Sequence, residues 1–139
     1  MIRPHGARME PAEFVFTGAV VSGRGEGRHF TQLDWVREQF RALLGFEPYP
    51  GTFNLRIDTG GEALLEALKR RAGIQILPPN ADFCAARCFA ARIGSLDGAL
   101  VIPLVPGYPS NVLELIAPVN VRATLGLDDG AVVTVSITA

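Results

Sequence analysis

Residues 45–57 read Gly45-Phe46-Glu47-Pro48-Tyr49-Pro50-Gly51-Thr52-Phe53-Asn54-Leu55-Arg56-Ile57, and the remainder of the chain can be interpreted from this stretch. Proline fixes φ and glycine adopts dihedral angles that other residues avoid, so the first half predicts a tight, pre-ordered turn. Residues 52–57 alternate polar and apolar side chains, as a half-buried strand does. Thr52 and Asn54 therefore share one face of the predicted strand, about 7 Å apart.

Thr52 and Asn54 are candidate metal ligands. A hydroxyl and an amide carbonyl are hard oxygen donors, which Mg²⁺ accepts together with phosphate oxygens. A plain turn followed by a strand with a polar exposed face would show the same pattern. The neighbouring segments decide between the two interpretations.

Composition favours one folded domain. The chain has 139 residues, of which 48% are hydrophobic and 19% are charged, which excludes a disordered protein. A net charge of −1 argues against a general nucleic-acid binder. The cations are twelve Arg and a single Lys, Lys69. This bias suits phosphate recognition, and it is equally typical of a GC-rich genome.

Cellular location and cysteine chemistry both indicate a protein of the reducing cytoplasm. No apolar run reaches the roughly 20 residues of a membrane span, and no secretory signal opens the chain, so a cytoplasmic protein is expected. Cys84 and Cys88 fall in residues 83–93, which are predicted to form a strand. Four residues along a strand span roughly 13 Å, too far for a disulfide. Both are interpreted as small core residues, and a zinc site is not expected.

The N-terminal third combines a strand with a glycine-rich segment. Residues 1–13 are interpreted as a loose leader before a single domain, 14–139, and residues 14–22 as the first strand. Glycines at positions 23, 25 and 27 let the backbone approach a ligand, and their N–H groups can cradle phosphates. A flexible hairpin loop would look the same. The segment is not a P-loop, because no G-K-[ST] follows, and protein-kinase motifs are absent.

Two helices are predicted on either side of the central strand. Thr31 is expected to cap the first, which ends at Gly45 and presents one apolar stripe of Leu33, Val36, Phe40, Leu43 and Leu44. Trp35 lies off the centre of this stripe, either as a lid over a pocket or as edge packing. Thr59 is expected to cap the second helix, which runs to Arg71.

The second half of the chain is rich in strands, predicted at residues 74–77, 83–93, 99–103, 112–116 and 131–138, with a short helical turn at 119–125. A mainly β fold follows, a small closed barrel with two or three helical inserts, because closure removes exposed strand edges. Glu114 interrupts the apolar run of residues 112–116. It is either an outward-facing strand residue or a functional carboxylate.

Four segments together resemble a known family. Residues 18–27 (GAVVSGRGEG), 44–55 (LGFEPYPGTFNL), 97–99 (DGA) and 114–118 (ELIAP) are similar to segments of the archaeal CTP-dependent riboflavin kinases. The resemblance is co-linear from about Phe14 to Ile137. It implies a six-stranded cradle-loop barrel, which is riboflavin-kinase-like, that transfers the γ-phosphoryl group of CTP to riboflavin and gives FMN and CDP.

The resemblance also implies roles for individual residues. Thr52 and Asn54 would bind Mg²⁺, and Glu114 would act catalytically on the acceptor side, with Pro106 and Tyr108 on the rim of the flavin pocket. The implied nucleotide contacts are Arg24, Gly25, Glu26, Gly27, Arg28 and His29, together with Val119, Asn120, Val121 and Arg122.

One departure from the family pattern keeps alternatives open. Where family members often carry a Thr after a basic residue, this chain has Val105-Pro106, and Pro106 supplies neither a hydroxyl nor an N–H group. A CTP-dependent kinase of a different small alcohol is the first alternative. The second is a non-enzymatic DNA-binding barrel, which residues 125–130 and the following strand also resemble. The expected protein is a monomer that binds neither nucleic acid nor membranes.

Overall fold

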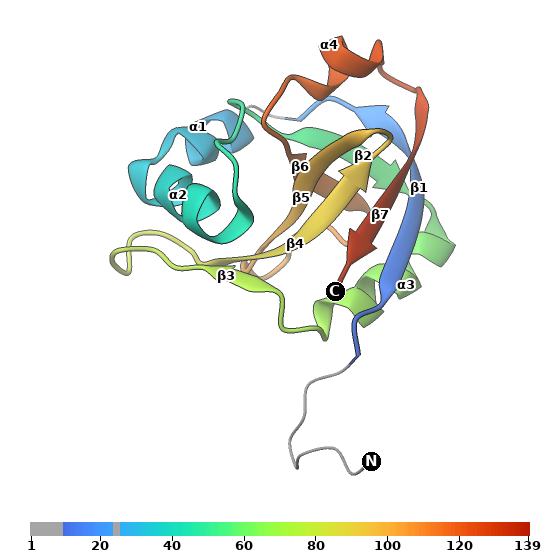
Figure 1. Ribbon diagram of the computed structural model, residues 1–139. Coiled ribbons are helices and arrows are strands. Elements are labelled where there is room, and N and C mark those ends of the chain that lie inside the picture. Colours follow the sequence, from blue (N-terminus) through green and yellow to red (C-terminus); the bar gives the residue numbers. More distant parts are fainter. Residues whose placement is uncertain (1–9, 24–25) are drawn as a thin grey trace.

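The computed structural model describes residues 10–23 and 26–139 (Figure 1). Its strands in these ranges are β1 (Glu13–Val21), β2 (Phe53–Ile57), β3 (Ile74–Ile76), β4 (Ala86–Ile93), β5 (Leu96–Pro103), β6 (Val112–Ile116) and β7 (Val132–Thr138). Its helices are α1 (Glu26–Gln32), α2 (Asp34–Gln39), the π-helical turn η1 (Phe40–Leu44), α3 (Thr59–Lys69) and α4 (Val121–Leu125).

Six of these strands close into a ring. The hydrogen-bonded order is β3-β4-β5-β6-β2-β1-β7, and β7 also pairs with β4, so the sheet returns on itself. Every pairing is antiparallel. Strand β3 stays outside the ring, because β4 pairs with β3 over residues 86–88 and with β7 over residues 90–93. The predicted mainly β closed barrel with helical inserts is confirmed.

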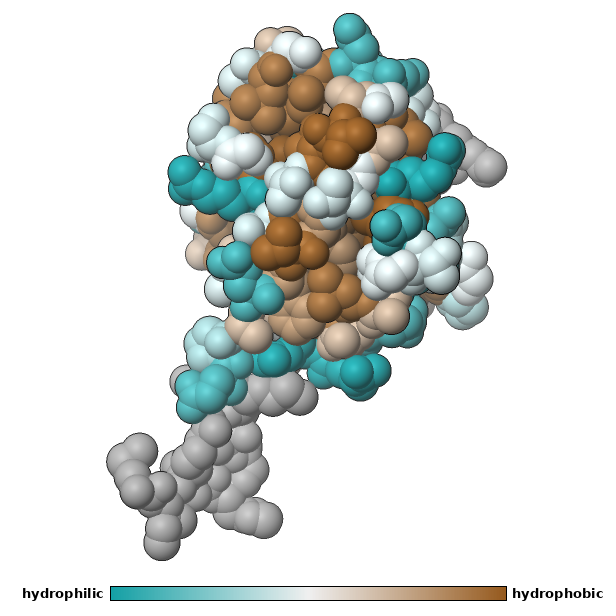
Figure 2. Space-filling model, turned by 90° about the vertical axis from the view of Figure 1, so that its right-hand side faces the viewer, coloured by the Kyte–Doolittle hydropathy of each residue, from teal (hydrophilic) through white to brown (hydrophobic). Residues whose placement is uncertain are grey.

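Two apolar clusters stabilise this arrangement. Alternate residues of β1, such as Phe14, Phe16 and Val20, point into the barrel and join the larger cluster. The smaller cluster lies between the α1–η1 insert and the barrel strands, and it includes Val36 and Phe40. Figure 2 shows that, on the face it presents, apolar side chains occur in separate groups among polar ones.

The two cysteines differ from the prediction in one respect. Cys88 is fully buried in the smaller cluster, as expected. Cys84 is exposed, because β4 begins only at Ala86 and Cys84 lies in the loop before it. The prediction of a core position for Cys84 was therefore wrong. Burial raises the pKa of the Cys88 thiol to about 12.

The helix starts also differ from the sequence prediction. Thr31 lies within α1 and caps no helix, so that prediction was wrong. The N-cap of α3 is Asp58, whose Oδ1 accepts a hydrogen bond from Gly61 N at 2.8 Å, one residue before the predicted cap Thr59. Gly45 ends η1 in the left-handed region with φ 80°, as its position predicted.

The chain enters the barrel beside the end of its last strand. Ala12 and Ala139 exchange two backbone hydrogen bonds, of 2.7 and 2.9 Å, and β1 begins at Glu13, one residue earlier than expected. The predicted leader falls mostly on residues 1–9, which lie outside the described residues. Among the helices of the described ranges, none combines the length and the apolar character needed to cross a membrane.

Candidate active site

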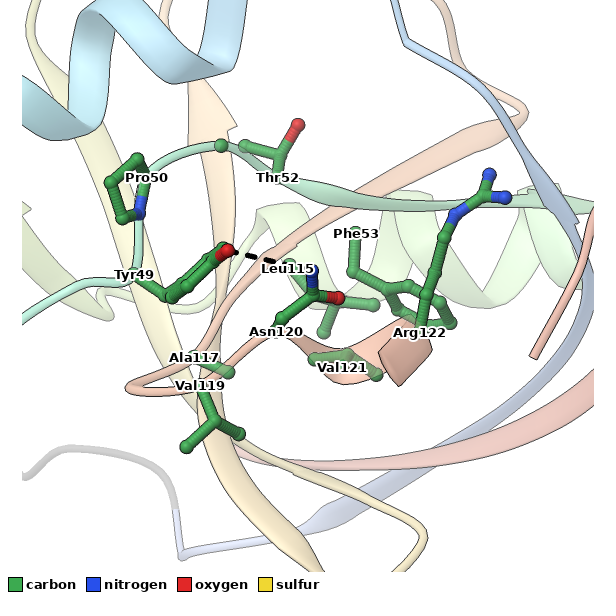
Figure 3. Close-up of a pocket in the computed structure, with 11 residues that line it drawn as sticks. Tyr49, Pro50, Thr52, Phe53, Leu115, Ala117, Val119, Asn120, Val121 and Arg122 are labelled. Carbon is green, nitrogen blue, oxygen red and sulfur yellow. Dashed lines mark hydrogen bonds between the residues drawn. The ribbon is translucent and has the colours of Figure 1, made fainter. Parts of the chain in front are cut away.

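Three neighbouring hollows meet at Thr52, just before β2. The first, of about 200 Å³, lies between residues 49–53 and residues 115–122 (Figure 3). The second, of about 810 Å³, lies between the glycine-rich segment and the loop 105–109. The third, of about 370 Å³, lies between α1–α2 and residues 83–86. Thr52 lines all three, so its side chain lies where the three hollows adjoin.

Thr52 and Asn54 form a pair at this junction. Thr52 Oγ1 donates a hydrogen bond to Asn54 Oδ1 at 3.0 Å. Asn54 is only 5% exposed and lies opposite Glu114 of β6. Adjacent oxygen ligands of an octahedral ion with bonds of 2.0–2.1 Å are about 2.9 Å apart, so the spacing suits Mg²⁺. The described residues contain no cluster of three or more His, Cys, Asp or Glu that could hold a metal ion.

Two glycines press against this pair. A Cβ atom on Gly23 would lie 2.3 Å from Asn54 Nδ2, and one on Gly27 would lie 2.5 Å from Thr52 Cγ2 and 2.6 Å from Thr52 Oγ1. Any side chain at these positions would displace the pair, so close backbone approach requires glycine here. Arg24 and Gly25 lie outside the described residues, as does the side chain of Glu26.

A buried threonine fixes the position of α1 relative to the central turn. Thr31 Oγ1 lies 3.0 Å from the carbonyl oxygens of Gly27 and Arg28, to which it can donate, and accepts a hydrogen bond from Gly51 N at 2.9 Å. Thr31 is 1% exposed. This hydroxyl thereby joins the glycine-rich segment to the turn before Thr52. Its role was missed in the sequence, because its partner Gly51 is 20 residues away.

Glu114 and Tyr108 lie together on the wall of the second and third hollows. Leu113 and Leu115 point into the core, each 1% exposed, while Glu114 lines the second and third hollows. Tyr108 OH donates a hydrogen bond to Glu114 Oε2. The outward-facing interpretation of Glu114 is thus correct in geometry, and the outward face is the wall of both hollows.

A hydrogen-bonded cluster of three polar side chains lies beside the first hollow, which Arg122 lines. Arg122 Nη2 donates to Asp129 Oδ1 at 2.6 Å, and Ser22 Oγ donates to both carboxylate oxygens of Asp129 at 3.1 Å. The hydrogen bond from Arg122, followed by that from Ser22, lowers the pKa of Asp129. The cluster joins the end of β1 to α4 and to the turn before β7. Ser22 and Asp129 were not predicted, because they are 107 residues apart in the sequence.

A family comparison matches almost the whole folded chain. The family model CTP-dep_RFKase, described as "Domain of unknown function DUF120", matches residues 20–137. The chain belongs to this family. The resemblance noted from the sequence is thereby confirmed.

Three archaeal proteins illustrate the similarity of this chain to known relatives. It is 43% identical over 123 residues to a protein named riboflavin kinase from Archaeoglobus fulgidus, covering 86% of this chain and 53% of the relative. It is 39% identical to riboflavin kinases of Methanocella arvoryzae and Ignicoccus hospitalis, covering 88% and 86% of this chain and 56% and 69% of those proteins. The chain thus spans little more than half the length of the first two.

The site residues expected for this CTP-dep_RFKase member are divided among the hollows. Val119, Asn120, Val121 and Arg122 line the first hollow, where Figure 3 shows the side chains of Asn120 and Tyr49 pointing toward one another. Gly27, Arg28 and Pro106 line the second, and His29 lines the third. Tyr108 and Glu114 line both the second and the third. The predicted nucleotide contacts therefore extend from the first hollow, past Thr52, to α1.

Proposed function

We propose that this chain is a riboflavin kinase that transfers the γ-phosphoryl group of CTP to the 5′-hydroxyl of riboflavin, giving FMN and CDP. The observation that carries the proposal is the Thr52–Asn54 oxygen pair at the junction of three hollows, with glycine backbone on one side and Glu114 on the other. The archaeal relatives are named riboflavin kinases, which supports riboflavin as the phosphoryl acceptor.

The donor nucleotide would lie across Thr52. The first hollow is small, at about 200 Å³, and favours a one-ring base, held near Tyr49 and Asn120. The phosphates would then extend into the second hollow, beside the backbone of Gly23 and Gly27, where Arg28 adds positive charge. Backbone N–H groups and cations stabilise the charge that spreads over the transferred group.

A divalent cation fits between these phosphates and the protein. Thr52 Oγ1 and Asn54 Oδ1 would hold Mg²⁺, which neutralises charge on the phosphate oxygens. To bind it, the Thr52 hydroxyl must turn its proton away from Asn54. The close approach of Gly23 to Asn54 Nδ2 would restrict rotation of the amide and keep Oδ1 beside the Thr52 hydroxyl.

On the acceptor side, Glu114 would receive the proton of the attacking hydroxyl. Its carboxylate faces the second hollow, across which the phosphates would lie, and the Tyr108 hydroxyl orients one of its oxygens. The chemistry needs mainly positioning and charge neutralisation, so no further catalytic group is required.

Pro106 favours one alternative, a kinase of a different small alcohol. Pro106 lines the second hollow without a hydroxyl or an N–H group to offer the acceptor. For riboflavin, one lost neutral hydrogen bond costs about 1 kcal/mol, which weakens binding without abolishing it. A loop reshaped for another alcohol would leave CTP and Mg²⁺ binding intact.

A coupled assay of nucleotide consumption tests the proposal. With Mg²⁺ and riboflavin, CTP should be consumed on the order of 10²-fold more efficiently than ATP, because a site shaped for cytosine rejects a purine by size and by unpaired polar groups. Asn54→Ala should remove activity and retain the fold, whereas Asn80→Ala, in an exposed loop, should behave as the wild type. Equal use of ATP and CTP, or full activity in Asn54→Ala, contradicts the proposal, and phosphorylation of another alcohol selects the alternative.

A further inference from the structure

Arg122 and Ser22 lie at the border between the first and the second hollow. Arg122 of α4 lines the first, Ser22 just after β1 lines the second, and Arg122 Nη2 donates to Ser22 Oγ at 3.4 Å. Figure 3 shows the Arg122 side chain extended away from α4. A nucleotide that occupies both hollows therefore comes near this guanidinium group.

Asp129 fixes the position of the guanidinium group. Its Oδ1 accepts a hydrogen bond from Arg122 Nη2 at 2.6 Å, and Ser22 Oγ donates to both of its oxygens at 3.1 Å. Asp129 does not occur among the described residues that line the three hollows, so it would influence a ligand there through Arg122. Within the described part of the chain, Arg122 uses only Nη2 for side-chain hydrogen bonds, which leaves Nε and Nη1 for a ligand.

The ion pair between these two residues is too exposed to add much to stability. The side chain of Arg122 is 36% exposed and that of Asp129 is 63% exposed. Water screens such pairs, so they contribute little to the free energy of unfolding. The hydrogen bonds from Arg122 and Ser22 lower the pKa of Asp129, so this carboxylate stays charged at neutral pH. The main effect of the pair is therefore expected on the orientation of Arg122.

A guanidinium group that is already held in place binds an anion more tightly than a mobile one. An arginine side chain has many rotamers, and a ligand that immobilises it must offset the lost rotamer entropy. A carboxylate that has immobilised the group beforehand removes this cost, which corresponds to up to about tenfold in affinity. The planar fork of donors on arginine also suits two phosphate oxygens at once.

We propose that Asp129 is a positioning residue, which together with Ser22 holds Arg122 against the phosphate groups of the nucleotide at the border of the first and second hollows. This inference rests on the proposed function for the identity of the donor. It assigns a role in donor binding to the turn before β7, a segment that lines none of the three hollows with its described residues.

Truncation of two adjacent aspartates tests this role. Asp129→Ala and Asp128→Ala each remove one negative charge from the same exposed turn. If Asp129 acts only as a charge, both variants should bind CDP at least as tightly as the wild type, because repulsion of the phosphates is reduced. If it positions Arg122, Asp129→Ala should weaken CDP binding about tenfold, and Asp128→Ala should keep the affinity of the wild type. Calorimetric titration with CDP and Mg²⁺ measures both.

Cytidine separates a lost phosphate contact from a change in the shape of the first hollow. It has no phosphate groups, so Asp129→Ala should bind it as the wild type does. In the coupled assay, the KM for CTP should rise about tenfold in Asp129→Ala, whereas the KM for riboflavin should stay constant. Equal losses for cytidine and CDP would show that the first hollow itself is disturbed, and they would overturn the positioning role.

A double-mutant cycle shows whether Asp129 acts through Arg122. In the Arg122→Ala background, the further change Asp129→Ala should leave the affinity for CDP unchanged, because the side chain that Asp129 positions has already been removed. A second tenfold loss in this background contradicts the proposal.

Failure of this inference can be told apart from failure of the proposed function. Wild-type affinity for CDP in Asp129→Ala, in a protein that phosphorylates riboflavin with CTP, overturns the positioning role alone. Wild-type protein that binds CDP and never phosphorylates riboflavin contradicts the proposed kinase, while the comparison of CDP affinities still decides the role of Asp129. Wild-type protein that does not bind CDP contradicts both.

Discussion

Gly27 is the residue at which the smallest change should have the largest effect on the site. A Cβ atom there would meet the Thr52 side chain at 2.5–2.6 Å, so Gly27→Ala should push Thr52 away from Asn54. Displacement of a catalytic group by about 1 Å costs on the order of 10²-fold in rate. We expect turnover to fall by that order in the CTP-dependent assay, and the Mg²⁺ concentration needed for half-maximal activity to rise.

Gly60 provides a matched control for this substitution. It lies in the first turn of α3, and a Cβ atom there meets nothing closer than Asp58 Oδ1 at 3.5 Å. Gly60→Ala should keep full activity and gain up to about 1 kcal/mol of unfolding free energy, because alanine favours the helix. Wild-type turnover and Mg²⁺ dependence in Gly27→Ala would show that the Thr52–Asn54 pair is not a metal site.

The sequence revealed the oxygen pair and missed most of the groups that hold it. Alternation along residues 52–57 was enough to place Thr52 and Asn54 on one face, and the apolar run around Glu114 was enough to single it out. Thr31 was predicted as a helix cap because threonine before an apolar run is the usual signal. Its actual partner, Gly51, is brought near only when the barrel forms, and no local pattern encodes that contact.

Among the elements, the helical insert between β1 and β2 departs most from its predicted form. One apolar stripe was expected, but Leu43 is 51% exposed whereas Val36 and Phe40 are fully buried. The cause is η1, in which Gly45 N donates to Phe40 O five residues earlier at 2.9 Å. The wider turn rotates Leu43 off the stripe, and periodicity counted at 3.6 residues per turn could not detect it.

The same turn yields a stability prediction. Phe40→Ala should lower the unfolding free energy by about 3–5 kcal/mol, because it opens a cavity between the insert and the barrel. Leu43→Ala should change it by less than about 0.5 kcal/mol, since the side chain is largely in solvent. Chemical denaturation of both variants checks the pair, and similar losses in the two would contradict the π-helical geometry.

At the level of the whole molecule, the predicted closed barrel was recovered, together with the number of strands that form it. Alternating segments and turn residues indicated about six strands, which is the number in the ring. Strand β3 lies outside the ring because β4 pairs with β3 up to residue 88 and with β7 from residue 90 onward. This change of pairing strand depends on tertiary contacts, which a local sequence pattern does not encode. Cys84 was misplaced for a related reason, because the strand it was assigned to begins two residues later.

The buried Cys88 thiol gives the barrel a dependence on alkaline pH. Its folded pKa of about 12 lies above the ordinary thiol value of about 8.5, so the unfolded chain loses this proton first as pH rises. The contribution is therefore complete below about pH 8.5 and falls by about 1.4 kcal/mol per pH unit above it. The advantage of wild type over Cys88→Ala in unfolding free energy should shrink accordingly, whereas Cys84→Ala should track the wild type. An advantage that stays constant to pH 10 would contradict the buried position of Cys88.

The double pairing of β7 has a consequence for the order in which the chain folds. This strand hydrogen-bonds to β1 on one side and to β4 on the other, and Thr17 and Thr134 in the first of these ladders are 117 residues apart. Contacts between such distant segments form slowly, because a long loop must close first. A nascent chain that still lacks β7 would expose two unpaired strand edges, which favour aggregation on the ribosome. Synthesis of the last strand is therefore the step that removes this risk.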